Sequence, residues 1–131
     1  MSLNKVYVDR EADYRLRALK ARTGLTPNLL CRLGFCLSLA EPGVPELELY
    51  ANGQEREFNR YTLTGEWDPL FFALLRERLH RDGLDPVADL EAQFKAHLGR
   101  GVQMLSQRVK TMADLAALIV TMQDKAGGVR A

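Results

Sequence analysis

The sequence predicts a mainly α fold, with a ribbon-helix-helix-like N-terminal half, a small β hairpin or arm, and C-terminal helices. Three patterns support this fold class. A short β-prone segment leads into two helical patterns separated by a glycine turn. An Asn-Gly pair then lies in an alternating stretch, and apolar residues recur at helical spacing beyond it. The chain has 131 residues, enough for one compact domain, so residues 1–131 are predicted to form a single domain.

The N-terminal core, residues 3–40, begins with a strand and a basic helix. In the segment LNKVYV, Val6 and Val8 share one face of the predicted strand. Asp9 is suited to cap a helix over residues 10–22. The apolar side of this helix is formed by Ala12, Leu16 and Leu19.

The second helix of the core, residues 27–40, is apolar on nearly every side. Gly24 suits the left-handed position after the first helix, Thr26 can cap the second, and Pro27 fits its first turn. A surface helix of a small domain needs only one apolar stripe. We therefore expect a second copy of the chain to cover part of this helix. The residues predicted for that oligomer core are Leu29, Leu30, Leu33, Phe35 and Leu37.

A β hairpin or extended arm is predicted over residues 46–63, after the loop EPGVP. Leu47 and Leu49 alternate with glutamates here. Asn52-Gly53 is a strong hairpin signal, because both residues accept positive φ. The acidic outer face of the arm disfavours contact with phosphate groups.

The remaining segment, residues 67–125, is predicted to be helical. One helix covers residues 67–81, and Asp85-Pro86 repeats a cap-and-proline start for the next. Thr111 is predicted to cap the last helix. Glycine is unfavourable in a helix interior, so two glycines are expected to break or bend the chain between these helices. They are Gly99 and Gly101.

Positive charge is concentrated in the N-terminal third. Residues 1–40 contain seven Lys and Arg against three Asp and Glu, a net +4, whereas residues 41–59 contain one against five, a net −4. This basic block favours an acidic partner, and free N–H groups at the start of the second helix can bind a phosphate. The alternative is a solvated helix face followed by a plain N-cap. The residues predicted to bind nucleic acid are Lys5, Arg10, Arg15, Arg17, Lys20, Arg22, Thr26 and Asn28.

The sequence shows no strong catalytic or metal-binding pattern. His80 and His97 stand apart from any zinc-ligand spacing, and there is no phosphate-binding loop. We expect no metal, no cofactor and no enzymatic activity. Cys31 and Cys36 lie among leucines and are interpreted as reduced, buried hydrophobic residues, with a sulfur relay as the alternative. Because no apolar run approaches a membrane span and no secretory signal is recognisable, a cytoplasmic protein without membrane contact is expected.

The stretches TGLTPNLLCRLGFCLSL, EFNRYTLTGEWDPLF and RDGLDP resemble the DndE family of DNA sulfur-modification proteins. The similarity spans about residues 3–122. It implies a small, mainly helical protein without recognised catalytic residues that forms a homo-oligomer, with a tetramer expected. It also implies work beside a cysteine desulfurase, a sulfur-transferring enzyme and an ATPase, which together replace a non-bridging phosphate oxygen of DNA by sulfur. Members of the family are thought to bind duplex DNA through basic surface residues, with nicked DNA as a proposed target.

Three functional hypotheses follow from the residues and the resemblance together. The first is a non-catalytic accessory subunit of the phosphorothioation machinery that binds the backbone of double-stranded DNA. The second is a structural scaffold that holds the sulfur-transfer enzyme and the ATPase together without touching DNA. The third is a weak DNA nickase.

Overall fold

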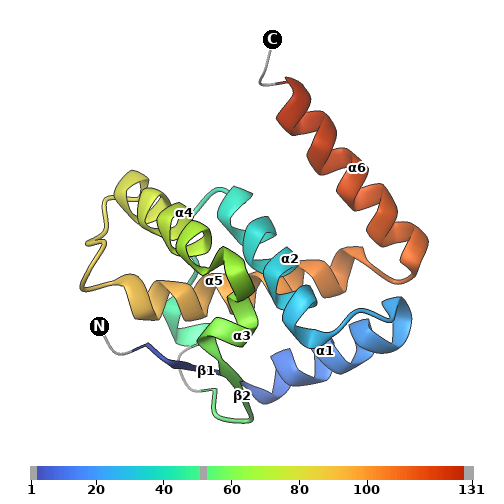
Figure 1. The fold of residues 1–131 in the computed structure, drawn as a ribbon, viewed down its shortest axis with the longest axis horizontal. Helices are drawn as coiled ribbons and strands as arrows, with labels where there is room; N and C mark the ends of the chain where they lie inside the picture. The colour runs from blue at the N-terminus through green and yellow to red at the C-terminus, as the bar shows by residue number, and fades with distance from the viewer. Residues whose placement is uncertain (1–2, 51–52, 129–131) are drawn as a thin grey trace.

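Helices make up most of the structure, and a two-stranded antiparallel sheet packs beside them (Figure 1). The computed structural model describes residues 3–50 and 53–128. The predicted mainly α fold class, with its small antiparallel sheet, is confirmed. The elements in chain order are β1 (Lys5–Val8), α1 (Arg10–Thr23), α2 (Pro27–Ala40), the 3-10 helix η1 (Leu47–Leu49), β2 (Arg56–Asn59), α3 (Arg60–Thr64), the 3-10 helix η2 (Gly65–Trp67), α4 (Asp68–Arg81), α5 (Leu90–Arg108) and α6 (Met112–Gly128).

The first two helices begin and end at the residues that the sequence indicates. The Asp9 carboxylate accepts a hydrogen bond from the Ala12 N–H at 2.8 Å, which satisfies a free donor at the start of α1. Gly24 ends α1 with φ of 76°, a conformation that costs glycine little. The Thr26 hydroxyl caps α2 by accepting from the Leu29 N–H at 3.4 Å.

The sheet joins two segments that lie about fifty residues apart in the sequence. β1 pairs with β2 in antiparallel register, from Lys5 opposite Asn59 to Val8 opposite Arg56. Val6 and its partner Phe58 are both buried, so the inward face of this small sheet contributes to the core. In a ribbon-helix-helix protein the first strand pairs with that of a second chain. Here its partner comes from the same chain.

The predicted hairpin or arm over residues 46–63 is wrong as a self-paired unit. Its first part forms η1, its strand is β2, and its end begins α3. Asn52 of the predicted turn lies outside the described residues. Gly53 is buried, and a side chain there would collide with the backbone of Val8 and Asp9. Because Gly53 has no side chain, the backbone at this position can lie close to the end of β1.

The central contact of the fold is the crossing of α2 and α5, where two glycines meet. A Cβ atom on Gly34 would lie 2.8 Å from the Gly101 carbonyl carbon, and one on Gly101 would collide with the Gly34 carbonyl. Gly99 likewise faces the ring of Tyr50. Of the predicted break or bend at these glycines, the break is wrong, because α5 runs as one helix through both. The close approach that they permit offsets their cost in a helix interior.

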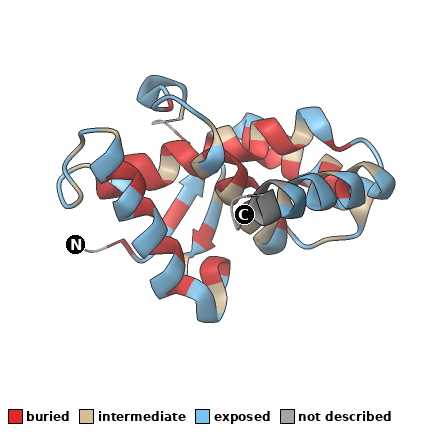
Figure 2. Ribbon diagram, turned by 90° about the horizontal axis from the view of Figure 1, so that it is seen from above, coloured by how far each residue is buried: buried red, intermediate tan, exposed pale blue. Residues whose placement is uncertain are grey.

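The C-terminal helices differ in how much of their surface is covered. The side of α4 that packs inward carries Phe71 and Phe72, and the Phe72 ring stacks on Phe94 of α5 at 4.9 Å between centroids. α5 begins at Leu90, later than predicted, because the Asp85 carboxylate binds nearby N–H groups in a turn instead. α6 extends away from the body (Figure 1) and is exposed along most of its length (Figure 2). None of the helices in the described ranges is both long and apolar enough to cross a membrane.

Candidate nucleic-acid interface

The exposed face of α1 carries basic side chains, some of which are paired with a carboxylate and some of which are not. Arg10 and Lys20 are exposed, and their side chains form no hydrogen bond or ion pair with another described residue. They lie ten positions apart, or about 15 Å along the helix axis. Tyr14 is exposed between them, with 68% of its surface accessible. This face therefore presents two unpaired cations on a rigid helix.

The other predicted cations of this helix are partly neutralised by carboxylates. Arg17 donates to Asp13 at 2.6 Å, and Arg56 of β2 donates to the second oxygen of the same carboxylate at 3.0 Å. Asp13 is itself buried, so two arginines hold a carboxylate that would otherwise be unpaired in the protein interior. Arg15 forms a longer pair with Glu11 at 3.6 Å. Arg17 and Arg15 therefore offer less charge to a ligand than their sequence positions indicate.

Lys5 lies on the outward face of the sheet and is also paired. Its ammonium contacts Glu57 of β2 at 3.1 Å. The hydrogen bond and charge of Glu57 raise the pKa of Lys5 above its ordinary value. Sequence reasoning missed this pair because it depends on β1 and β2 lying side by side. Lys5 is thus ion-paired, unlike Arg10 and Lys20 of α1.

The turn between α1 and α2 brings together basic groups from two parts of the chain. Arg22 donates weakly to the Val109 carbonyl at 3.5 Å, so the segment between α5 and α6 lies beside the end of α1. Lys110 follows directly and is exposed. Sequence reasoning missed Lys110, which lies 88 positions after Arg22 in the chain. Its only sequence signal was its positive charge.

The start of α2 follows this basic turn. Thr26 is exposed and already accepts the Leu29 N–H, while Asn28 is half-buried. The first N–H groups of a helix point outward and carry partial positive charge, which suits an anion. The structure thus places Lys20, Arg22 and this helix start within one continuous stretch, with Lys110 alongside.

The predicted oligomer core divides between two faces of α2. Leu30, Phe35 and Leu37 are buried inside this chain, and α5 is the main neighbour of α2. These three are therefore unavailable to a second copy, and the expectation for them is corrected. The long apolar helix needed a cover, and α5 supplies it from the same chain. Leu33 is half-buried and Leu29 is 40% exposed, so both remain accessible.

The two cysteines are in different surroundings. Cys31 is fully buried, and burial raises the pKa of its thiol to about 12. Cys36 is only half-buried, contrary to the prediction, because it lines a groove between α2 and α4. Burial also raises the pKa of the Cys36 thiol. A raised pKa disfavours the thiolate, the form in which cysteine acts as a nucleophile.

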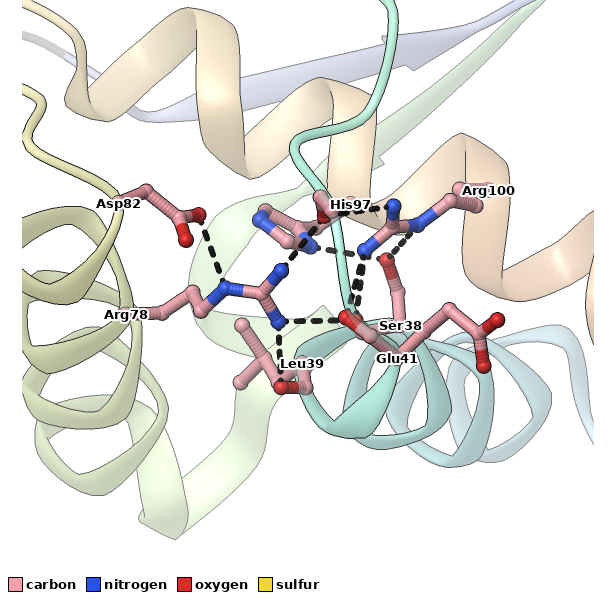
Figure 3. A network of polar contacts seen from close by, with 8 residues as sticks. Ser38, Leu39, Glu41, Arg78, Asp82, His97 and Arg100 are labelled. Carbon is pink, nitrogen blue, oxygen red and sulfur yellow. Dashed lines mark hydrogen bonds and ion pairs between the residues drawn. The ribbon is translucent and has the colours of Figure 1, made fainter.

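A dense polar network encloses the C-terminal end of α2 (Figure 3). Arg78 donates to the carbonyls of Leu39 at 2.7 Å and Gly43 at 2.6 Å, and to the Asp82 carboxylate at 2.8 Å. Arg100 approaches from α5 and donates to the Ser38 carbonyl at 2.8 Å. Two guanidinium groups thus satisfy the free carbonyls at the negative end of the helix dipole.

A serine and a histidine lie next to each other in this network. Arg100 Nε donates to Ser38 Oγ at 2.8 Å, and Ser38 Oγ also shares a hydrogen bond with His97 Nδ1 at 2.8 Å. Both side chains have no accessible surface. Burial, followed by the charges of Arg100 and Arg78, lowers the pKa of His97 to about 4. The pair resembles a nucleophile and its base, but its burial assigns it to the core.

Metal-ligating groups are dispersed over the described part of the chain. No three His, Cys, Asp or Glu side chains within residues 3–50 and 53–128 are grouped so that they could hold a metal ion.

Comparison with known proteins gives a family and a solved structure. The family model for DndE, described as DNA sulphur modification protein DndE, matches residues 5–113. The chain is similar to the crystal structure of DndE from Escherichia coli B7A, which is described as involved in DNA phosphorothioation modification. They share 25% sequence identity, the match covers 80% of this chain and 98% of that chain, and the TM-score is 0.63. The comparison with curated proteins gave no match.

Proposed function

Because the chain belongs to the DndE family of DNA sulphur modification proteins, we propose that it is a non-catalytic, DNA-binding accessory subunit of DNA phosphorothioation. The observation that carries this proposal is the surface around α1, with unpaired Arg10 and Lys20 and the basic turn before α2. Its partners are double-stranded DNA, including nicked DNA, and the cysteine desulfurase, sulfur-transfer enzyme and ATPase of the same system.

The chemistry of this surface favours the DNA backbone over the bases. Arginine, lysine and a helix N-terminus all bind phosphate oxygens, which are alike in every sequence. The spacing between Arg10 and Lys20, about 15 Å, is long enough to reach several phosphates of one strand. We therefore expect binding with little sequence preference and a steep dependence on salt.

The test is a titration of fluorescent duplexes, intact and nicked, at salt concentrations from about 50 to 200 mM. The variant Arg10→Ala/Lys20→Ala/Arg22→Ala should bind every duplex more weakly. The slope of the logarithm of its binding constant against the logarithm of salt concentration should become shallower by about one for each phosphate that the variant no longer binds. Arg76→Ala is the matched control, since Arg76 is an exposed arginine on α4.

Two outcomes would contradict the proposal. If the triple variant bound with an unchanged slope, the surface around α1 would not be the DNA site. If the wild-type protein bound no duplex at low salt, the scaffold function would replace DNA binding.

We propose further that the protein acts as a homo-oligomer, with a tetramer expected, and that an apolar surface of α2 and α4 holds it together. Leu29 and Leu33 of α2 lie outside the core, as do Leu70 and Leu74 of α4, which are 50% and 43% exposed. Leu33→Glu would place an unpaired charge in such an interface and should dissociate it. Monomeric wild-type protein in sedimentation at micromolar concentration would contradict this assembly.

One observation favours the scaffold function as a second candidate. Tyr61 and Trp67, beside the start of α4, are 53% and 54% exposed. Tyrosine and tryptophan are enriched among the residues that dominate protein–protein binding. Tyr61→Ala/Trp67→Ala should therefore weaken capture of a purified Dnd partner and leave duplex binding unchanged. No feature of the described residues favours the nickase.

A further inference from the structure

The buried carboxylate of Asp13 connects the sheet to the exposed face of α1. Asp13 lies in the first turn of α1, and only 7% of its surface is accessible. Its Oδ1 accepts a hydrogen bond from Arg56 of β2 at 3.0 Å, and its Oδ2 accepts one from Arg17 of α1 at 2.6 Å. Each carboxylate oxygen therefore has one guanidinium partner, the half-buried Arg56 or the exposed Arg17.

Arg56 is held in place by the sheet. β1 and β2 pair so that Arg56 lies opposite Val8, one residue before the N-cap of α1, which brings the arginine to the first turn of that helix (Figure 1). Its guanidinium lies 5.3 Å from the centroid of the buried Phe58 ring. A cation over the face of an aromatic ring is attracted to it. The carboxylate of Asp13 is thus bound by a residue whose own position the fold determines.

Arg17 is the outer member of this trio, and most of it remains in solvent. Its side chain is 67% exposed, and its Nη2 atom is the one that bonds Asp13. Its Nε and Nη1 atoms form no hydrogen bond with another residue in the ranges 3–50 and 53–128. A guanidinium carries five donors in a rigid plane, and two of them match two oxygens of a phosphate. One edge of Arg17 is therefore fixed and another is available to a ligand.

Arg17 lies on one side of α1 with Arg10 and Tyr14. The three are at positions i, i+4 and i+7, which fall on one face of a helix. Tyr14 is 68% exposed, and Arg10 is also exposed. The Asp13 carboxylate reduces the charge that Arg17 presents, but two arginines and one carboxylate still carry a net charge of +1. The trio is therefore attractive to phosphate.

We propose that Asp13 is a positioning residue of the DNA interface: its carboxylate, held by Arg56, fixes the Arg17 guanidinium so that its free edge binds a phosphate of the DNA backbone. The proposal rests on the DNA-binding function proposed above and adds Arg17 as a phosphate contact. An arginine fixed before binding loses less conformational entropy when the phosphate arrives. Asp13 thus strengthens DNA binding even though its own charge repels phosphate.

The first test compares two substitutions that each remove one negative charge from α1. Asp13→Asn leaves one acceptor oxygen for two arginines, so Arg17 is no longer fixed. It should weaken duplex binding about fivefold, the equivalent of ordering one long side chain, although the net charge of the protein rises by one. Glu11→Gln is the matched control, since Glu11 is exposed and forms only the longer pair with Arg15 at 3.6 Å. It should strengthen binding slightly, because it removes repulsion alone.

A double-mutant cycle shows whether Asp13 acts through Arg17. Arg17→Ala should weaken binding to every duplex, and the slope of the logarithm of the binding constant against the logarithm of salt concentration should become shallower by about one. In that background Asp13→Asn should no longer weaken binding, because no arginine at position 17 is left to release. A purely structural role of Asp13 would weaken binding equally in both backgrounds. Circular dichroism checks that each variant is folded under the binding conditions.

A further measurement needs no DNA. Nuclear magnetic relaxation of the Arg17 Nε–H group gives an order parameter for the motion of this side chain in the free protein. In the wild-type protein it should exceed the order parameter of the Arg10 Nε–H group, because the side chain of Arg10 has no partner among the described residues. In Asp13→Asn the value for Arg17 should fall toward that of Arg10. Equal values for the two arginines in the wild-type protein would overturn the proposal.

The results separate this proposal from the DNA-binding function on which it rests. If the wild-type protein bound duplex and Asp13→Asn strengthened binding as Glu11→Gln does, the positioning role would be overturned while DNA binding stood. If Arg17→Ala kept the wild-type affinity and slope, Arg17 would not contact phosphate, and the proposal would fail in the same way. A wild-type protein that bound no duplex at low salt would overturn both.

Discussion

Acidification should destabilise the protein through one buried side chain, His97. The imidazole has no accessible surface, and its Nδ1 is hydrogen-bonded to the Ser38 hydroxyl at 2.8 Å. Burial is the main cause that lowers its pKa from 6.5 to about 4, and the nearby Arg100 and Arg78 lower it further. Asp82 opposes this shift without overcoming it. Neutral imidazole is therefore the form that the folded network holds.

The direction of the effect follows from proton binding. The unfolded chain takes up a proton at this histidine near pH 6.5, whereas the folded chain does so only near pH 4. Between these values the unfolded state binds more protons, so the free energy of unfolding falls as the pH falls. The loss between pH 7 and pH 5 is about 2 kcal/mol, and it approaches about 3 kcal/mol below pH 4.

The assay is urea unfolding followed by circular dichroism at pH 7 and pH 5, at one fixed protein concentration. His97→Asn retains a group that can donate or accept a hydrogen bond with Ser38 but does not titrate, so it should lose about 2 kcal/mol less than wild type over this interval. The variant's stability at pH 7 alone is not informative, since the smaller side chain leaves a cavity. Equal pH dependence in wild type and variant would refute the assignment to His97.

Two further predictions concern the core and are checked by the same unfolding assay. Gly101→Ala should lower the free energy of unfolding by about 3 kcal/mol, because the added methyl would collide with the Gly34 carbonyl where α2 crosses α5. Its control is Gln107→Ala, on the exposed side of α5. A loss below about 0.5 kcal/mol for Gly101→Ala would contradict the tight crossing. Arg60→Ala should cost about 3–5 kcal/mol, because it leaves the buried Asp68 carboxylate without the two hydrogen bonds that Arg60 donates at 3.0 Å. Adding Asp68→Asn should recover part of that loss, and its failure to do so would show that the ring contact of Arg60 with Phe72 matters more than the charge pair.

The helix boundaries near the N-terminus could be predicted because their causes are local. Asp9, Gly24 and Thr26 each act on residues within one turn. The partner of β1 could not be predicted, since strand pairing joins residues far apart and many segments satisfy the same alternation. The role of Gly101 could not be predicted either. The sequence shows that a glycine is unfavourable in a helix there, but it does not show the contact with Gly34.

The basic character of the first forty residues could be read from the sequence, whereas the pairing of the individual charges could not. The excess of positive charge in the first forty residues is a property of the sequence alone. Which of those charges are free depends on neighbours from elsewhere, such as Arg56 sharing Asp13 with Arg17. The same holds for Lys110, which the fold brings beside Arg22 through the Val109 carbonyl. Charge patterns therefore locate a region, and tertiary pairing selects the residues within it.

The pairing of β1 with β2 has a consequence for how the protein is made. On the ribosome the chain emerges from its N-terminus, so β1 is complete about fifty residues before the strand that it pairs with. The apolar face of α2 remains uncovered for longer still, because α5, its main neighbour, is synthesised later. During that interval α2 exposes leucine and phenylalanine side chains to water, which makes the nascent chain a substrate for chaperones and a risk for aggregation. A truncated message ending before residue 90 should accordingly yield an insoluble product, even though it encodes β1, α1 and α2 in full.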